Sequence, residues 1–519
     1  MAVSSNSYET TVQIDSFSGF NQSVGDRGMS MKYAVDGENF CTTGGMLRSM
    51  DGGREHIPAA LDAPIGTLML LYRRFRDSEN DYFHNEPEIL IAVAGDKVYA
   101  RPLNRKGELY KEWHEIYSGV TNDTFDYVTY ETSTYWIRNG NRVDPRTEGA
   151  IKVTANDPID VLIMTNADDG MFIVYGDSLE VVPYKVQPSS TDIEKRFGVL
   201  TRHAERIWGA AISDQPDMLM YSTPFDPLNW EQNDEYPEDG AGDIQLPSWD
   251  GDSFVALRTY GSYLLAIKKN RVWRVSGTNP GEYYLKEQFG GGTIVENTVV
   301  VYNDYMFLLS YDGLMVYDGT AVQPFRQPFI KDLMKRVNWS KVDGAVAGMR
   351  GPIYCLAMPI DSSDVNNAIL EYNTSEGTFN LRVGVYASSF LEYQNALYYT
   401  DSRPAEGSGS LVGRVMKLDG EGEALPMRYV TAYQDLGYKS ITKSGFEVYL
   451  LADTDMTVVV GIRTEKKIKT RTVMLTGGKA KRARLNVAGR SFRLELNVAE
   501  TKPWCLSGGI QINMELDSD

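Results

Sequence analysis

Residues 263–325 alternate short apolar runs with two-residue polar turns, and this alternation constrains the fold more than any other feature of the chain. The Asp312-Gly313 turn is a strong hairpin signal, because the favoured two-residue turns need positive φ angles that Asp and Gly tolerate. The run 305–309 is bounded by such turns and is too short for a helix, so it predicts a strand buried on both faces. The stretch therefore predicts a meander of antiparallel strands.

Comparable hairpin cores recur along the chain at an interval of roughly 40–50 residues. They centre near residues 90, 130, 171, 207, 263, 305, 355 and 395. This period is the one expected of β-propeller blades, although the Gly-His and Trp-Asp marks of WD40 blades do not recur with it. The sequence predicts an all-β fold in which a β-propeller of six to eight blades, with seven favoured, spans residues 61–425.

The character of the chain changes after a Gly- and acid-rich break formed by residues 406–413 and 419–423. Short strands at roughly ten-residue spacing then predict a small C-terminal antiparallel β-sandwich across 426–519. Residues 1–60 predict an ordered strap associated with the propeller, which either runs along neighbouring elements or completes the ring by adding a strand. Apolar residues at helical spacing in 328–339 predict one amphipathic helix of about three turns.

Composition excludes several classes of protein. An apolar content of 42% supports a large core, and a net charge of −18 argues against a general nucleic-acid coat. Cys41, Cys355 and Cys505 are odd in number and widely spaced, which predicts reduced thiols rather than disulfides or a zinc site. The N-terminus lacks the basic and apolar regions of a signal peptide, and no stretch approaches the roughly eighteen apolar residues of a membrane span. We therefore expect a chain made in a cytoplasm.

No catalytic or metal-binding motif stands out. The four histidines lack partners at metal or triad spacing, and the glycine run at 290–292 lacks the lysine of a P-loop. Carboxylate pairs of the kind that glycosidases use are inevitable among 70 acidic residues, so they discriminate nothing. The acidic loop 419–423 and the Asp168-Asp169 turn contain calcium-ligand residue types without EF-hand spacing, and solvated turns are the alternative. The sequence predicts no enzyme, cofactor or metal.

Two blocks of like charge are the candidate functional surfaces. Within 463–493, eleven Lys and Arg residues stand against one Glu, and within 231–252, eight acidic residues have no Lys or Arg between them. Each block is either a solvated face or an electrostatic docking surface, for a neighbouring subunit or for a passing phosphate backbone. Few aromatic residues interleave with the basic ones, so any nucleic-acid contact would be nonspecific. The interaction candidates are Arg463, Lys466, Lys467, Lys469, Arg471, Lys479, Lys481, Arg482, Arg484, Glu231, Asp234, Glu235, Glu238 and Asp239.

Several phrases of the chain resemble a known family. They are GVLTRHAERIWGAA (198–211), DMLMYSTPFDPLNW (217–230), YGSYLLAIKKNRVWRVSG (260–277) and LLSYDGLMVYDG (308–319), with FSGFNQS near the start and SGGIQINMELDSD at the end. These phrases are similar to β-propeller virion proteins of phage necks and tails, including packaged-DNA stabilisation proteins and tail-nozzle proteins of short-tailed phages. The resemblance implies several copies in a ring, six-fold favoured, around the DNA exit channel beneath a portal or adaptor. It brings no family active site with it.

Together these features predict a structural component of a phage virion, in its neck or tail, that is made in the host cytoplasm. The expected homo-oligomeric ring sits on a portal or adaptor and helps to form or close the DNA exit channel. A channel that must release DNA should not hold it tightly, and each phosphate contact adds affinity, so protein docking is favoured for the basic block. The rival interpretation is a tail-associated propeller that binds or hydrolyses glycans, with exposed tyrosines as stacking platforms.

Overall fold

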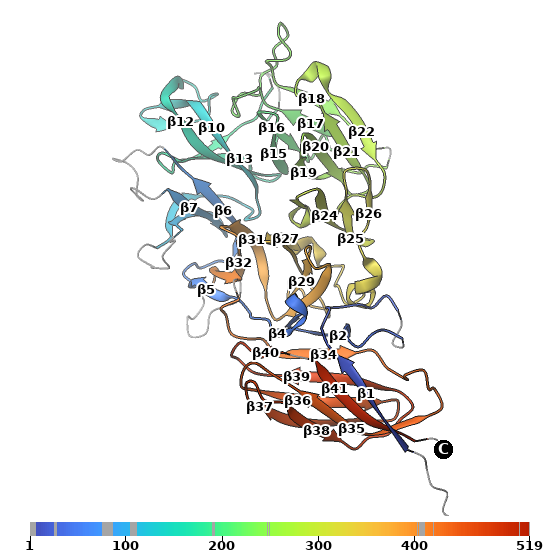
Figure 1. Ribbon diagram of the computed structural model, residues 1–519. Helices are drawn as coiled ribbons and strands as arrows, with labels where there is room; N and C mark the ends of the chain where they lie inside the picture. The colour runs from blue at the N-terminus through green and yellow to red at the C-terminus, as the bar shows by residue number, and fades with distance from the viewer. Residues whose placement is uncertain are drawn as a thin grey trace, which may run out of the picture.

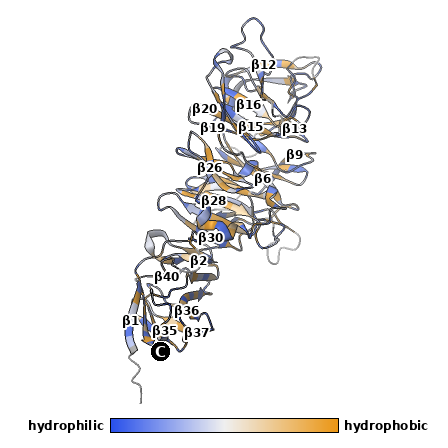
Figure 2. Ribbon diagram, turned by 90° about the vertical axis from the view of Figure 1, so that its right-hand side faces the viewer, coloured by the Kyte–Doolittle hydropathy of each residue, from blue (hydrophilic) through white to orange (hydrophobic). Residues whose placement is uncertain are grey.

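A computed structural model describes the chain except residues 1–6, 25–27, 75–86, 104–111, 189–192, 247, 249, 402, 404–410, 419, 508 and 518–519. The described chain is nearly all β, with a ring of short antiparallel sheets and a two-sheet sandwich on the rim of that ring (Figure 1). Turned by 90°, the molecule is long and narrow, with the sandwich at one end of its long axis (Figure 2). The predicted all-β fold is confirmed.

The ring is a β-propeller of seven blades, each a four- or five-stranded antiparallel sheet built from consecutive or nearly consecutive strands. The first blade comprises β6 (Ile65–Tyr72), β7 (Glu88–Ala94), β8 (Lys97–Pro102) and β9 (His114–Ser118). The second comprises β10 (Asp126–Arg138), β11 (Asn141–Arg142), β12 (Ile151–Asn166), β13 (Gly170–Tyr175) and β14 (Val181–Tyr184). The third comprises β15 (Val199–His203), β16 (Arg206–Ala210), β17 (Met218–Tyr221) and β18 (Gly242–Gln245). The fourth comprises β19 (Phe254–Tyr260), β20 (Tyr263–Lys268), β21 (Val272–Ser276) and β22 (Tyr284–Gln288). The fifth comprises β23 (Val300–Tyr302), β24 (Tyr305–Ser310), β25 (Gly313–Tyr317) and β26 (Val322–Pro324). The sixth comprises β27 (Val346–Arg350), β28 (Ile353–Met358), β29 (Ala368–Asn373) and β30 (Thr378–Val383). The seventh contains β31 (Ala387–Tyr393), β32 (Ala396–Asp401) and β33 (Arg414–Leu418).

Each blade buries both of its faces against its two neighbours. Seven clusters of buried apolar side chains fill the seven junctions between blades. In β24, Met306 and Leu308 pack toward the fourth blade, whereas Phe307 and Leu309 pack toward the sixth, because successive residues of a strand point to opposite faces. Burial on both faces therefore explains why this strand is apolar throughout.

The N-terminal strap closes the ring. Strand β5 (Arg54–Ile57) pairs with β33 and is the outermost strand of the seventh blade, so this sheet joins the two ends of the propeller sequence. Both courses that the sequence left open for the strap are observed, because β5 adds a strand to the ring while the residues before it run along the sandwich and the sixth blade. Ring closure of this kind gives the seventh blade its fourth strand.

The sandwich draws strands from both ends of the chain, which differs from the expected boundary at residue 426. One sheet has the order β1-β41-β35-β38 and the other β2-β34-β39-β36-β37, with a small third sheet β3-β4-β40 beside them. The strap was expected to belong to the propeller, but its first strands complete these sheets because their apolar faces cover the sandwich core. The strands are β1 (Ser7–Ile14), β2 (Ala34–Glu38), β3 (Phe40–Cys41), β4 (Leu47–Ser49), β34 (Met427–Thr431), β35 (Thr442–Leu450), β36 (Met456–Thr464), β37 (Ile468–Leu475), β38 (Lys481–Leu485), β39 (Phe492–Val498), β40 (Cys505–Leu506) and β41 (Ile510–Asp517).

One continuous apolar core joins the sandwich to the fifth and sixth blades. The strap supplies its middle part, where the rings of Phe17 and Phe40 lie 5.3 and 5.1 Å from the ring of Tyr429. Asn39 adds a polar link, since its amide donates to the carbonyl of Pro426 and its carbonyl accepts from the amide of Val383. The sandwich is therefore fixed to the rim of the sixth blade by packing as well as by the chain.

Helical structure is shorter than the sequence predicted. Where about three turns were expected, a 3-10 turn η4 (Gln327–Ile330) leads into a four-residue helix α1 (Lys331–Met334). The helix ends there because Val337 forms an antiparallel bridge with Ile360, and this tertiary pairing overrides the helical spacing. The other helical elements are the 3-10 turns η1 (Thr43–Gly45), η2 (Pro280–Glu282), η3 (Glu296–Thr298) and η5 (Val342–Gly344). None of the described helices is long and apolar enough to cross a membrane.

Candidate functional site

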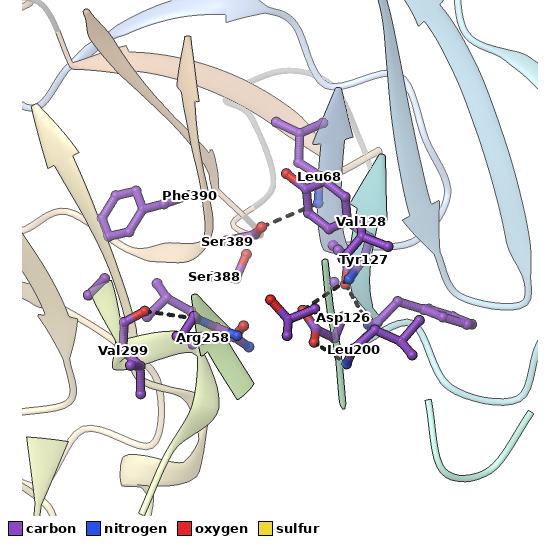
Figure 3. Close-up of a pocket in the computed structure, with 17 residues that line it drawn as sticks. Leu68, Asp126, Tyr127, Val128, Leu200, Arg258, Val299, Ser388, Ser389 and Phe390 are labelled. Carbon is purple, nitrogen blue, oxygen red and sulfur yellow. Dashed lines mark hydrogen bonds between the residues drawn. The ribbon is translucent and has the colours of Figure 1, made fainter. Parts of the chain in front are cut away.

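The innermost strands of all seven blades surround a cavity of about 330 Å³ on the propeller axis. Arg258 from β19 and Asp126 from β10 point into this axial cavity, and Ser389 approaches it from β31 (Figure 3). The cavity is therefore polar, whereas the junctions between blades are apolar. These polar side chains are therefore candidates for a binding or catalytic site.

Most of these polar groups join one blade to the next. The amide of Leu68 donates to Oγ of Ser389 at 3.3 Å, and the amide of Leu200 donates to a carboxylate oxygen of Asp126 at 2.7 Å. Each such bond satisfies a main-chain or side-chain group that ring closure would otherwise bury unpaired. Side-chain bonds across the other five junctions are Thr67–Phe125, Thr259–Arg202, Arg258–Val299, Tyr354–Thr298 and Asn366–Ala387.

One carboxyl near the axis binds its proton more tightly than an ordinary glutamate does. Burial raises the pKa of Glu296 well above its ordinary value, and the negative charge of Asp126 raises it further. The guanidinium of Arg258 opposes this shift from 3.5 Å but does not reverse it. About a fifth of the Glu296 side chain is exposed, so its proton can exchange with water. Glu296 therefore holds its proton at pH values where an ordinary glutamate is ionised.

Replacing Glu296 with Gln is expected to alter the pH dependence of stability. The raised pKa means that wild-type stability from this group is fully present below pH 4.5 and is lost as pH rises through the folded-state pKa. The Gln variant keeps a neutral side chain at every pH, so its melting temperature should exceed that of the wild type by a margin that grows above pH 4.5. Thermal melts from pH 4 to 9 measure the margin, and a constant margin would refute the assignment.

The basic block occupies one edge of the sandwich. It lies on the end of β36, on β37 and on β38, and β37 and β38 are the last strands of their two sheets on the same side. We call this surface the basic edge; it comprises the candidates Arg463, Lys466, Lys467, Lys469, Arg471, Lys479, Lys481, Arg482 and Arg484. The structure thus brings all nine predicted basic residues to one side of one domain.

The basic edge is only partly neutralised. Arg463 pairs with Glu495, and Arg482 and Arg484 share Glu447, whose pKa these arginines and Tyr449 lower despite partial desolvation. The other six cations form no ion pair with any described residue, and all six are exposed. These six are Lys466, Lys467, Lys469, Arg471, Lys479 and Lys481.

The opposite edge of the sandwich has the opposite character. Its last strands are β1 and β2, which contain Glu9, Asp36 and Glu38 but no Lys or Arg. Asp36 is paired with Arg428, whereas Glu9 and Glu38 form no ion pair within the described chain. Figure 1 places β1 and β37 on opposite sides of the sandwich. The two edges of this domain therefore differ in charge, which the sequence alone did not reveal.

The acidic block lies far from the basic edge. Glu231, Asp234, Glu235, Glu238 and Asp239 are exposed in the loop between β17 and β18 of the third blade. Figure 1 shows β18 at the end of the molecule opposite β37, so the structure does not bring the two predicted blocks together. They are separate surfaces.

The acidic loop is held by a residue that sequence reasoning missed. Arg206 is buried, and its guanidinium donates to the carbonyls of Ser222 and Gly240 at 2.7 and 2.6 Å and to that of Glu238. The basic residue inside the phrase LTRHAERIW was visible, but nothing local indicated that its partners lie up to 34 residues away. The loop is therefore held to the third blade by the Arg206 side chain.

A second missed group is a buried ion network in the sixth blade. Glu371 on β29 lies 2.7 Å from Arg382 and 3.0 Å from Arg350, and the Glu371 and Arg382 side chains are both only 2% exposed. Arg382 also donates to the carbonyl of Asp51 in the strap. Although burial raises the pKa of Glu371, the two arginines hold it below its ordinary value. This network links the sixth blade to the closing strap.

The Asp168-Asp169 turn and the acidic loop 419–423 are the two segments considered for calcium. Asp169 accepts hydrogen bonds from Thr121, Asn122 and Asn166, and these bonds hold its pKa low despite partial desolvation. Asp169 therefore joins the turn between β12 and β13 to the segment between β9 and β10. Asp419 lies outside the described residues. Among the described residues, no group of three or more His, Cys, Asp and Glu side chains is arranged to hold a metal ion, and the three cysteines are unpaired.

Comparison with known proteins does not place the chain in a family. No protein-family model matches it, and no curated protein matches it. Among solved structures, it is similar to the Neurospora crassa Pan2 WD40 domain, at 10% identity and a TM-score of 0.33 over 70% of this chain and 98% of that chain. It is also similar to an exo-β-1,3-galactanase from Phanerochaete chrysosporium, at 9% identity and a TM-score of 0.24 over 74% of this chain and 100% of that chain. TM-scores this low carry no argument.

Proposed function

We propose that this protein is a structural component of a phage virion neck or tail, which assembles into a ring on a portal or adaptor and helps to form or close the DNA exit channel. The proposal starts from the resemblance of several sequence phrases to phage neck and tail propellers. The observation that carries it furthest is the difference in charge between the two edges of the sandwich.

The two edges suit a contact between neighbouring copies. The six unpaired cations of the basic edge would face Glu9 and Glu38 on the next copy, so the contact joins two different surfaces. Contacts of this heterologous kind close into a ring when each copy is rotated relative to the last by a fixed fraction of a turn. Complementary charges raise the association rate and fix the register of such an interface.

Protection of exposed strand edges is the simpler explanation of the lysines, because charged side chains discourage strand addition. That explanation accounts for a charge on each free edge, Glu9 on β1 included, but it does not account for the sorting of cations to one edge and carboxylates to the other. The concentration of six unpaired cations on one edge therefore supports a partner of opposite charge.

Duplex DNA is the competing partner for the basic edge. Phosphate contacts give affinity that falls steeply with salt, and a channel that must release DNA gains nothing from tight contacts. A protein neighbour with acidic residues avoids this problem. We therefore assign the basic edge to protein contact.

Sedimentation of the purified chain, alone and mixed with portal or adaptor rings from the same phage, tests the proposal. A defined oligomer, formed alone or only on that template, is the expected result. A chain that remains a monomer of 58.2 kDa in both conditions would refute the ring. Tight binding of the basic edge to duplex DNA at physiological salt would refute the protein assignment of that edge instead.

A further inference from the structure

A cleft of about 230 Å³ lies between the second and third blades, at the end of the molecule away from the sandwich. One wall comes from the long β10–β12 hairpin, which contributes Trp136 and Lys152. The other comes from the β17–β18 loop, which contributes Asp226 and Trp230. The cleft is thus separate from the axial cavity and from the basic edge.

The loop wall is rigidly placed. The hydroxyl of Tyr184 donates to the carbonyl of Leu228, and the amide of Leu228 donates to one carboxylate oxygen of Asp226 at 3.2 Å. The ring of Trp230 lies 5.0 Å from that of Phe197 in the core between the blades. The main chain of this wall is therefore held to the blades by contacts within the chain.

Two polar atoms of this wall have unused hydrogen-bonding capacity. Trp230 is 2% exposed, and its indole Nε1–H is buried with no hydrogen-bond partner among the described residues. The second carboxylate oxygen of Asp226 likewise receives no hydrogen bond from a described residue. Burying a donor without a partner is unfavourable, and a ligand that supplies the missing acceptor would recover part of that cost.

The charges around the cleft are balanced. Lys152 and Arg146 stand against Asp226 and Glu231, so an ion of either sign would meet two like charges. Lys152 Nζ lies 5.2 Å from the ring of Trp136, and this tryptophan gives the cleft an aromatic wall. A neutral ligand with both hydroxyl groups and a C–H face matches this combination of groups.

We propose that the cleft binds one neutral sugar ring of a saccharide. Adjacent hydroxyls of the sugar would donate to the free oxygen of Asp226 and accept from the indole N–H of Trp230, while the C–H face lies against Trp136. Pockets of this type use a few placed polar groups for orientation and an apolar wall for contact. The inference does not depend on ring assembly, since the sandwich is at the other end of the molecule.

The test is saturation-transfer NMR with titration on the full chain, using methyl α-glucoside, methyl β-galactoside and methyl N-acetyl-β-glucosaminide as probes. At least one probe should bind saturably in the millimolar range, and Trp136→Ala and Asp226→Asn should each weaken binding by about tenfold or more. Trp136→Tyr keeps an aromatic ring and should stay within a few fold of the wild type. Tyr284→Ala is the matched control, because Tyr284 is an exposed ring on β22 outside the cleft.

Three outcomes would overturn the proposal. One is the failure of all three glycosides to saturate the wild-type chain at concentrations up to about 50 mM, far above the millimolar range expected. Another is binding that Trp136→Ala and Asp226→Asn leave unchanged while their melting temperatures match the wild type. The third is tighter binding of the methyl glucuronide, a charged probe, than of the neutral glucoside.

Discussion

A chain carrying Lys469→Glu and Lys481→Glu is expected to sediment as a monomer under conditions in which the wild type forms rings. Both residues are exposed, lie on the two strands of the basic edge and have no acidic partner within the described chain. Reversal therefore breaks no ion pair inside the monomer, but it would set like charges against Glu9 and Glu38 of the next copy. Like charges brought together at an interface cost several kcal/mol, which is enough to dissociate a ring of moderate affinity.

Charge reversal on the acidic edge tests the same interface. A chain carrying Glu9→Lys and Glu38→Lys should also fail to assemble alone, because its two edges are then both basic. An equimolar mixture of the two variants should recover rings, since copies can alternate and every contact again joins opposite charges. Velocity sedimentation of each variant and of the mixture, at low and at physiological salt, measures this.

Lys439→Glu with Lys502→Glu is the matched control for the charge reversal. Both lysines are exposed on the sandwich but lie outside the basic edge, so the net charge change is identical. The control chain should assemble like the wild type. Rings that survive reversal of the basic edge, or that are lost equally in the control, would contradict the proposed interface.

Replacing Glu371 with Gln is expected to lower the free energy of unfolding by about 3–5 kcal/mol, the usual cost of breaking a buried ion pair. Gln has the same shape but removes the negative charge that compensates Arg350 and Arg382, and both guanidiniums then remain in the interior. Because Arg382 also holds the strap at Asp51, the loss should extend to the closing strand of the ring. Denaturant unfolding, followed by fluorescence, measures the change.

The pH profile of the wild type checks the same network. The pKa of Glu371 is held below its ordinary value, so its stabilising contribution is present above pH 4.5 and is lost as pH falls through the folded-state pKa. The free energy of unfolding of the Gln variant should not show this loss at low pH. Glu282→Gln, at an exposed position in η2, is the control and should leave stability within about 0.5 kcal/mol of the wild type. A loss below 1 kcal/mol for Glu371→Gln would show that the network is not what holds the blade.

Local patterns in the sequence were sufficient to predict the blades. Asp-Gly and Asn-Asp turns between apolar runs follow from backbone conformation, and a run such as 305–309 is apolar because both faces of a blade are buried. The period of roughly 40–50 residues then predicted the propeller. The turn and strand signals each lie within one hairpin and the period is the spacing between successive hairpins, which is why both could be recognised without the structure.

Features that join distant segments were not predictable in the same way. The pairing of β1 and β2 with the C-terminal strands moved the domain boundary, and neither strand differs in composition from one that would lie on the propeller. Val337 ends the helix early through a bridge to Ile360, which no local spacing encodes. The basic block was visible as a run of charge, but its position on an edge, opposite an acidic edge, depends on sheet order.

The strap that closes the propeller also sets an order of events during synthesis. Tyr8 pairs with Leu516 and Ile57 with Val415, so the strap is made before the blades but finds its partners only after they have been synthesised. Blades one to six can form as they emerge, because their strands are neighbours in sequence. The seventh blade and the sandwich cannot, and contacts of such long sequence separation form slowly. Until then β1 and β5 are unpaired and can pair with strands of another chain, so these two strands are the ones most exposed to aggregation during synthesis.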